Sequence, residues 1–115
     1  MKVKKLFVMF LAIFGLSTVN AFADEPMLQA TPFSEIEKKV GKEPMMLEFG
    51  ATHCRSCIAM GKILYKIKEK YPKSNIYFID IYEDKKSAEK FKVRMIPTQK
   101  YLDNNGSVVD THMGI

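Results

Sequence analysis

The chain has 115 residues, enough for one domain. Its formal net charge is +5, but three of the lysines, Lys2, Lys4 and Lys5, stand at the very start and the rest of the chain is nearly balanced. This balance excludes the strongly basic surface of a typical nucleic-acid-binding domain, so we expect no nucleic-acid partner.

The N-terminus has the pattern of a secretory signal peptide. An apolar run over residues 6–18 follows the basic start, and Ala21-Phe22-Ala23 then supplies the small residues of a cleavage site. The run is short for a membrane-spanning helix, which needs about 20 residues. We therefore predict a cleaved signal peptide over residues 1–23 and a periplasmic or secreted mature protein without a permanent membrane anchor. An uncleaved N-terminal anchor is the alternative.

The domain is predicted to begin after a short lead-in. Residues 24–31 have mixed polarity and no period, so we expect a flexible lead-in before a domain over residues 32–115. Thr31 and Pro32 favour the start of a helix, because Pro fits the first helical turn and Thr can cap it. Gly41 ends this helix.

Strands and helices then alternate along the chain. In order, the patterns predict a strand over 45–51, a helix over 58–71, a strand over 76–82, a short helix over 83–92, and two strands over 98–102 and 107–112. The turn Asp103-Asn104-Asn105-Gly106 joins the last two strands as a hairpin. The apolar face of the helix over 58–71 comprises Ile58, Met60, Gly61, Ile63, Leu64, Ile67 and Tyr71.

This order predicts an α/β fold with a mixed central sheet flanked by helices. Strands that are connected through a helix are expected to be parallel, and the final hairpin is antiparallel.

The sequence has only two cysteines, Cys54 and Cys57. Disulfides persist outside the cytoplasm, but a small exported scaffold that depends on them usually carries about four or more cysteines. A disulfide that closes so short a loop constrains the unfolded chain very little. We therefore predict that the pair is reactive rather than structural.

The cysteines stand where a strand gives way to a helix. The helix N-terminus favours a thiolate, and the neighbouring Arg55 adds a full positive charge. We therefore expect Cys54 to have a lowered pKa and to be the exposed nucleophile. Cys57 follows one helical turn later and is expected to be the buried thiol that resolves a mixed disulfide.

A zinc site is the main alternative for such a cysteine pair. Zinc takes about four ligands in structural sites, or about three and a water in catalytic sites. The only histidines are His53 and His112, and the sequence has no second C-x-x-C motif. We therefore expect no metal.

The segment from Phe49 to Cys57, FGATHCRSC, resembles the active-site strand and loop of the thioredoxin family. Ile96-Pro97-Thr98, about 43 residues after Cys54, resembles the cis-proline turn of that family. The turn at Asp103–Gly106 and the segment His112-Met113-Gly114 resemble the hairpin that follows and the end of its last strand. The resemblance covers nearly all of residues 31–115 and implies a thioredoxin-like fold.

The family usually finishes with a helix that covers one face of the sheet. This sequence stops at Ile115, directly after the last predicted strand, so we expect that C-terminal helix to be missing. A sequence fragment, a partner that covers the face, and compensation by residues 24–40 all stay open as explanations.

The resemblance also implies roles for individual residues. Pro97 would be cis beside the cysteine pair, and Ile96 would offer backbone groups to an extended substrate segment. Glu48 stands where the family often places a buried acid, whose pKa burial would raise and which would take the proton from Cys57. An ordinary charged residue at a strand edge is the alternative for Glu48.

The motif departs from the commonest family pattern around the cysteines. His53 replaces a Trp, Arg55-Ser56 replaces Gly-Pro, and Gly50 stands where a second aromatic residue is frequent. We expect His53 and Arg55 to contact substrate, with a solvated ring as the alternative for His53. These changes leave the reduction potential open.

Taken together, the resemblance implies a thiol–disulfide oxidoreductase whose redox-active disulfide Cys54–Cys57 serves without any other cofactor. Export favours a reductase of disulfides in other exported proteins, including apocytochrome c, with electrons from a membrane-embedded thiol transporter.

Two alternatives remain. A disulfide-forming oxidant or isomerase is disfavoured because dedicated oxidants of this fold usually carry an inserted helical domain. The stretch from Cys57 to Pro97 has no room for one. A non-catalytic binding module with a thioredoxin fold is disfavoured because both cysteines are present.

Overall fold

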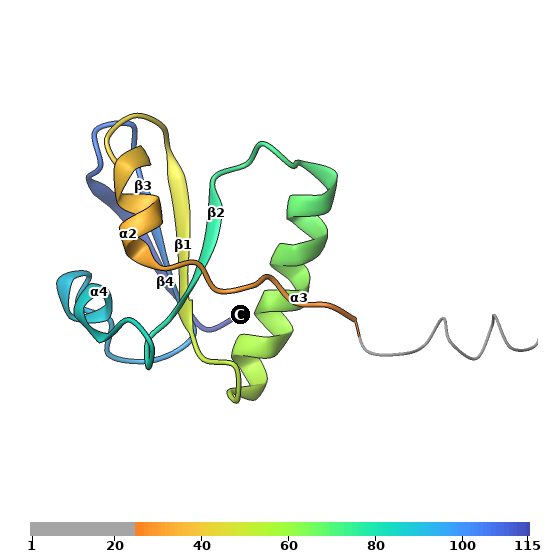
Figure 1. Cartoon of the computed structure of the whole chain (residues 1–115). Helices are drawn as coiled ribbons and strands as arrows, with labels where there is room; N and C mark the ends of the chain where they lie inside the picture. The colour runs from red at the N-terminus through yellow and green to blue at the C-terminus, as the bar shows by residue number, and fades with distance from the viewer. Residues whose placement is uncertain (1–24) are drawn as a thin grey trace, which may run out of the picture.

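The computed structural model describes residues 25–115, so the signal peptide predicted over residues 1–23 lies outside the described part of the chain. A four-stranded sheet in the order β2-β1-β3-β4 divides the molecule (Figure 1). Strand β1 (Met45–Gly50) is parallel to β2 (Ile76–Asp80) and antiparallel to β3 (Thr98–Leu102). Strand β4 (Val108–Met113) pairs antiparallel with β3.

Helices lie on both faces of this sheet. The short helix α2 (Phe33–Ile36), the 3-10 turn η1 (Glu37–Lys39) and helix α4 (Lys85–Lys90) cover one face, and the long helix α3 (Arg55–Lys70) covers the other (Figure 1). This is the mixed α/β arrangement that the order of predicted elements indicates.

The main hydrophobic core lies between the sheet and the side of α2 and α4. Alternate residues of β1 point to this side, because side chains along a strand alternate between the two faces. Phe91, just after α4, places its ring 5.4 Å from the rings of both Phe33 and Phe49. Burial of one such side chain contributes about 1.5–3 kcal/mol. The buried members of this cluster are Phe33, Ile36, Met45, Leu47, Phe49, Ile79 and Leu102.

The strands predicted over 45–51 and 98–102 and the hairpin turn between the last two strands are confirmed. At this turn the carboxylate of Asp103 accepts hydrogen bonds from the backbone N–H groups of Asn105 and Ser107, at 2.9 and 3.0 Å. Gly106 has a φ of +83°, a conformation that glycine adopts without steric cost.

The first helix differs from the prediction. It is only one α-helical turn followed by η1, and Thr31 does not cap it. The backbone N–H of Phe33 instead donates to the carboxylate of Asp84, at 2.9 Å. Thr31 is held elsewhere, because its own N–H donates to the carbonyl oxygen of Phe78 at 2.8 Å. A residue distant in sequence therefore replaces the expected local cap.

The segment over residues 24–31 was expected to be a flexible lead-in, but its described part forms backbone hydrogen bonds with the domain. Leu28 N–H donates to the carbonyl oxygen of Gly61 in α3 at 3.0 Å, and Ala30 forms a parallel bridge with Phe78 in β2. The segment runs from α2 across to α3 in Figure 1. Its Met27 side chain packs on Gly61, where an added Cβ would come within 2.7 Å of the methionine Cε. These contacts could not be predicted from the sequence, since the segment has no period.

Helix α3 is amphipathic, as predicted, but part of its apolar face is in solvent. Gly61 and Leu64 are buried, whereas the exposed fractions of Ile63, Ile67 and Tyr71 are 45%, 37% and 57%. The sequence places these three side chains on the apolar face of the helix. They stay exposed because, among residues 25–115, no second helix lies beside α3 on this side of the sheet.

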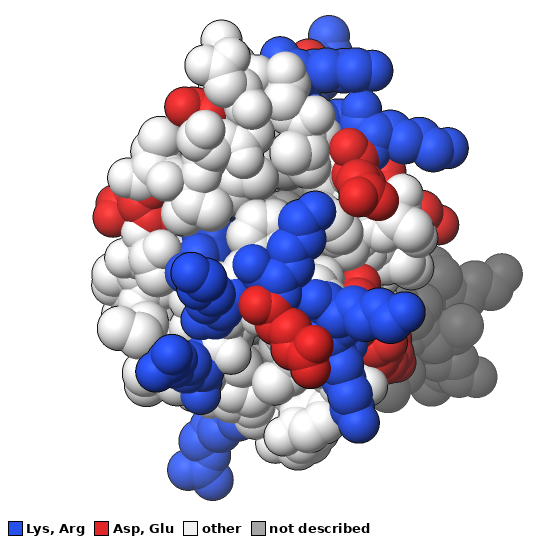
Figure 2. Space-filling view, turned by 90° about the vertical axis from the view of Figure 1, so that its left-hand side faces the viewer, with Lys and Arg blue, Asp and Glu red and all other residues white. Residues whose placement is uncertain are grey.

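The surface over α2 and α4 carries charges of both signs. Figure 2, which views the molecule from this side, shows lysine and arginine side chains gathered over part of the face with acidic side chains among them. Charges of both signs are therefore interspersed on this face. Within the described part of the chain, no helix is both long and apolar enough to cross a membrane.

Candidate active site at the N-terminus of helix α3

The two cysteines lie at the junction between β1 and α3. Strand β1 ends at Gly50, and a short loop leads to Cys54, whose extended backbone makes it the N-cap of α3. The carbonyl oxygen of Cys54 accepts the first helical hydrogen bond, from the N–H of Ile58 at 2.9 Å. The helix therefore presents its first free N–H groups to the sulfur of Cys54.

Cys54 is a partly exposed free thiol. Its Sγ accepts a hydrogen bond from the backbone N–H of Cys57 at 3.3 Å and lies 3.5 Å from the hydroxyl of Ser56. Partial burial by itself raises the pKa of Cys54, but hydrogen bonds from the side chains and N–H groups of Cys57 and Ser56 outweigh it. The pKa of Cys54 therefore lies below its ordinary value, which favours a thiolate.

Cys57 has the opposite environment. It is 1% exposed, and its sulfur lies close to Gly50, where an added Cβ would come within 3.1 Å of it. Desolvation raises the pKa of Cys57 to about 12, with further contributions from its hydrogen bond to Cys54 and from the charge of Glu48. Cys57 therefore keeps its proton at neutral pH and needs a base before it can attack. These are the properties expected of a nucleophile and a resolving thiol, and the roles themselves stay predictions.

Glu48 lies in the middle of the sheet and is 1% exposed. Its strand, β1, is central, with β2 on one side and β3 on the other, so the alternative of a charged residue at a strand edge does not apply. Desolvation raises the pKa of Glu48 from 4.5 to about 7, although a hydrogen bond from Gln99 opposes this rise. A carboxyl group with this pKa can exchange protons near neutral pH.

Two polar residues behind Glu48 were missed at the sequence level. Gln99 lies directly opposite Glu48 in β3, is 1% exposed, and donates through Nε2 to both carboxylate oxygens at 3.1 and 3.2 Å. Its Oε1 lies 2.6 Å from Nδ1 of His112 in β4. The one available signal was a glutamine two residues after Pro97 in a predicted strand. The strand register that aligns it with Glu48 is not visible in the sequence.

The turn at Ile96 and Pro97 leads into β3. The Ile96–Pro97 peptide bond is cis, Pro97 is buried and Ile96 is half-buried. Thr98 pairs with Phe49, so the turn lies at the end of the sheet where β1 stops and α3 begins. The backbone N–H of Gly114 donates to the carbonyl oxygen of Pro97 at 2.8 Å.

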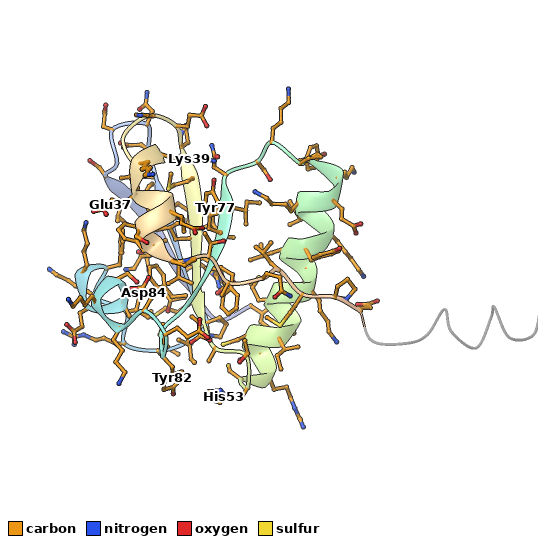
Figure 3. The ribbon with its side chains drawn as sticks, viewed as in Figure 1. Glu37, Lys39, His53, Tyr77, Tyr82 and Asp84 are labelled. Carbon is orange, nitrogen blue, oxygen red and sulfur yellow. The ribbon has the colours of Figure 1, made fainter. Side chains whose placement is uncertain are left out.

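His53 and Arg55 both lie on the exposed side of the site. The His53 ring packs against Tyr82 with 5.1 Å between ring centroids, and the two side chains lie together at this end of the molecule in Figure 3. The His53 ring is exposed and also packs against Tyr82, so a substrate contact and a solvated ring both stay predictions. A shallow hollow of about 470 Å³ beside Cys54 is lined by His53, Arg55, Ile58, Ala59 and Lys62.

The sequence predicts that the charge of Arg55 lowers the pKa of Cys54. The groups that lower the pKa of Cys54 are Cys57 and Ser56, and Arg55 is not among them. The Arg55 side chain is exposed, where solvent and salt screen its charge. Local hydrogen bonds therefore lower the pKa of Cys54, and both the effect of the Arg55 charge and its contact with substrate stay predictions.

No group of three or more His, Cys, Asp or Glu side chains within residues 25–115 is arranged to hold a metal ion. The chemistry that the described side chains support is thiol chemistry at Cys54 and Cys57, with Glu48 close enough for its charge to act on Cys57.

Comparisons with known proteins agree on one family. Residues 26–114 match the sequence model of the thioredoxin family, whereas no curated protein is similar at a significant level. Thioredoxin from Fasciola hepatica has 21% identity and a TM-score of 0.66, with 76% of this chain and 86% of that chain covered. The oxidised mitochondrial thioredoxin 3 from Saccharomyces cerevisiae has 22% identity and a TM-score of 0.62, with coverage of 76% and 83%. Thioredoxin from Trypanosoma brucei brucei has 17% identity and a TM-score of 0.65, with coverage of 81% and 83%.

Proposed function

The chain belongs to the thioredoxin family, and on that premise we propose that it reduces disulfides in exported proteins through Cys54 and Cys57. The predicted thioredoxin-like fold is confirmed by the family match and by the solved structures. The family also supports thiol–disulfide oxidoreductase activity, which in thioredoxins needs no cofactor beyond the redox-active disulfide.

The observation that carries the proposal is the contrast between the two thiols. Cys54 is accessible and has a lowered pKa, whereas Cys57 is buried and has a pKa of about 12. The exposed thiolate of Cys54 can attack the substrate disulfide, whereas the buried Cys57 stays protonated and unreactive until the mixed disulfide has formed.

The reaction then has two exchange steps. In the first, the Cys54 thiolate attacks one sulfur of the substrate disulfide, forms a mixed disulfide and releases the other substrate sulfur as a thiolate. In the second, Cys57 gives its proton to Glu48 and attacks the sulfur of Cys54. This step forms the Cys54–Cys57 disulfide and releases the second substrate thiolate. Two electrons pass to the substrate, whose disulfide becomes two thiols.

The signal-peptide pattern of residues 1–23 supports a site of action in the periplasm or outside the cell. There the substrates are cysteine-containing exported proteins, and a cytoplasmic reductase has no access. A membrane-embedded thiol transporter is therefore the proposed electron donor, which returns the Cys54–Cys57 disulfide to two thiols. The hollow beside Cys54 and the exposed His53 and Arg55 support a substrate contact on that side.

The redox state of the cysteines in the source cell tests this direction. Cells are fractionated and quenched with acid, free thiols are alkylated, and the modified protein is resolved by mass. A mostly reduced pair in an extracytoplasmic fraction is expected of a reductase with a dedicated electron supply. A mostly oxidised pair that stays oxidised contradicts the reductase and favours a disulfide-forming oxidant. Recovery of the protein in the cytoplasm contradicts export.

A further inference from the structure

Gln99 connects the buried carboxylate to the surface of the sheet. Its side chain is 1% exposed, yet it makes four polar contacts. Nε2 contacts both oxygens of Glu48 and donates to the carbonyl oxygen of Gly114 at 3.0 Å. Oε1 lies 2.6 Å from Nδ1 of His112, which is exposed in the outer strand β4. One amide therefore joins β1, β3 and β4 behind the cysteine pair.

These contacts determine which way the amide points. The Glu48 carboxylate and the Gly114 carbonyl both accept hydrogen bonds, so the NH2 group of Gln99 must face them. Oε1 is then left for His112, and because an amide oxygen only accepts, Nδ1 of His112 must donate. His112 thus holds Gln99 in the orientation that presents a donor to Glu48.

We propose that Gln99, held by His112, is a positioning residue of the resolving step, which keeps the Glu48 carboxylate ionised and aimed to accept the proton of Cys57. This inference rests on the proposed function, because it presupposes that Cys57 attacks Cys54. Neither Gln99 nor His112 touches the reacting sulfurs. They act through Glu48. Burial favours the protonated form of this carboxyl group, and a hydrogen-bond donor stabilises its ionised form.

The surroundings of Glu48 leave Gln99 as its main polar partner. In β2 the residue opposite Glu48 is Phe78. The one acid of this strand is Asp80, whose Oδ1 accepts the N–H of Tyr82 at 2.9 Å. From α3 the facing titratable groups are Cys57 and, at the helix start, Cys54. In β3 the opposite residue is Gln99 itself, and β4 contributes His112 through it. No cation pairs with Glu48 among these groups, so the amide is its compensating donor.

The resolving step can be isolated with a chromophoric thiol. The reduced full chain reacts with Ellman's reagent in a stopped-flow instrument. Cys54 first displaces one thionitrobenzoate and keeps the other in a mixed disulfide, and Cys57 then displaces the second. The second phase is independent of reagent concentration, and its rate as a function of pH reports the group that takes the proton from Cys57.

Four variants are compared with the wild-type chain. Glu48→Gln removes the base, and Gln99→Leu removes the donor. His112→Phe frees the Gln99 amide, and because position 112 is exposed, the fold is expected to tolerate this change. Thr111→Val is the control, because this neighbouring hydroxyl accepts only from Lys100, at 3.1 Å, on the other face of the strand.

The wild-type rate is expected to rise through a pH of about 7, the pKa of Glu48. Gln99→Leu moves this rise to higher pH. A move of about one pH unit slows the second phase about fivefold at neutral pH and leaves the alkaline rate unchanged. His112→Phe gives a smaller move in the same direction, and Thr111→Val gives none.

The outcomes separate the inference from the proposed function. Suppose that Glu48→Gln removes the rise, whereas Gln99→Leu and His112→Phe both keep the wild-type pH profile or are both slowed equally at every pH. The positioning role of Gln99 is then wrong, and the proposed reductase function stands. If Glu48→Gln keeps the rise, or Cys57 releases no second thionitrobenzoate, the proposed resolving step is wrong and the inference falls with it. If Gln99→Leu does not fold, the profile of His112→Phe decides alone.

Discussion

The backbone N–H of Cys57 donates a hydrogen bond to the sulfur of Cys54 over 3.3 Å. The resolving residue therefore stabilises the thiolate of the nucleophile before any substrate arrives. The hydroxyl of Ser56, 3.5 Å from the same sulfur, adds a second donor. The thiolate is thus held by hydrogen bonds from its immediate neighbours in the chain.

Ser56→Ala is expected to raise the pKa of Cys54, because it removes one of the groups that lower it. Arg55→Gln is the matched control at the neighbouring exposed position and is expected to change this pKa less. The pH dependence of Cys54 alkylation by iodoacetamide, followed in the reduced protein, measures both. A larger rise in Arg55→Gln than in Ser56→Ala contradicts the hydrogen-bond explanation and restores the electrostatic one.

Glu48 is expected to make stability depend on pH. Its pKa is about 7 in the folded protein against 4.5 for the ordinary group, so the folded state holds the proton to a higher pH than the unfolded chain. The contribution of protonated Glu48 to the stability of the folded state is then fully present below pH 4.5 and is lost as the pH rises through about 7. At about 1.4 kcal/mol per pKa unit, the free energy of unfolding falls by about 3 kcal/mol across this window.

Urea denaturation of the wild-type chain and of Glu48→Gln at a series of pH values measures this effect. All other titratable groups are common to the two proteins, so the difference between the two curves isolates Glu48. Curves that run parallel from acidic to alkaline pH contradict the raised pKa.

Gly50→Ala is expected to disturb the resolving cysteine. The added methyl group would come within 3.1 Å of the Cys57 sulfur and 3.2 Å of the ring of Phe78. Both neighbours are buried, so relief requires a shift in packed core atoms, and overpacking of this kind costs about 1–3 kcal/mol. Unfolding by urea measures the loss of stability. The thionitrobenzoate assay measures the rate of attack by Cys57, which we expect to be slower.

Gly61→Ala is the control for this substitution. Its methyl group would also be crowded, but by the Met27 side chain, whose Cε and Cβ would be 2.7 and 3.1 Å away, and not by a catalytic residue. Alanine also favours the interior of a helix over glycine by about 1 kcal/mol. We expect a smaller loss of stability and an unchanged resolving rate. Equal effects of the two substitutions on that rate would show that the contact with Cys57 is not the cause.

The sequence was sufficient to predict those parts of the structure that depend on local patterns. The strand β1, the helix after Cys54 and the hairpin at Asp103 follow from hydrophobic period, capping and turn residues within a few positions of one another. The position of Cys54 and Cys57 at the start of a helix follows from the same patterns.

The missed features depend on contacts between distant residues. The hydrogen bonds from Gln99 to Glu48 and from Phe33 to Asp84 each join residues 51 positions apart. The first needs the antiparallel register of β1 with β3, and the second needs α2 and α4 on the same face of the sheet. Neither the register nor the choice of face is encoded in a short segment. The exposure of Ile63 and Ile67 likewise depends on which elements share the surface of α3, and helical period alone does not give that.

Asp84→Ala is expected to destabilise two helices at once. One carboxylate oxygen accepts the N–H of Phe33 at the start of α2 at 2.9 Å, and the other accepts the N–H of Ser87 in α4 at 3.4 Å. Loss of a helix cap costs about 0.5–2 kcal/mol, and the upper end is expected because two groups lose their acceptor.

Asp84→Asn keeps one acceptor and should lose less stability than Asp84→Ala. Glu83→Ala at the neighbouring exposed position should stay within about 0.5 kcal/mol of wild type. Urea denaturation ranks the three variants. A loss in Asp84→Ala no larger than that in Glu83→Ala would mean that water replaces the carboxylate at both helix starts and that the link between α2 and α4 contributes nothing to stability.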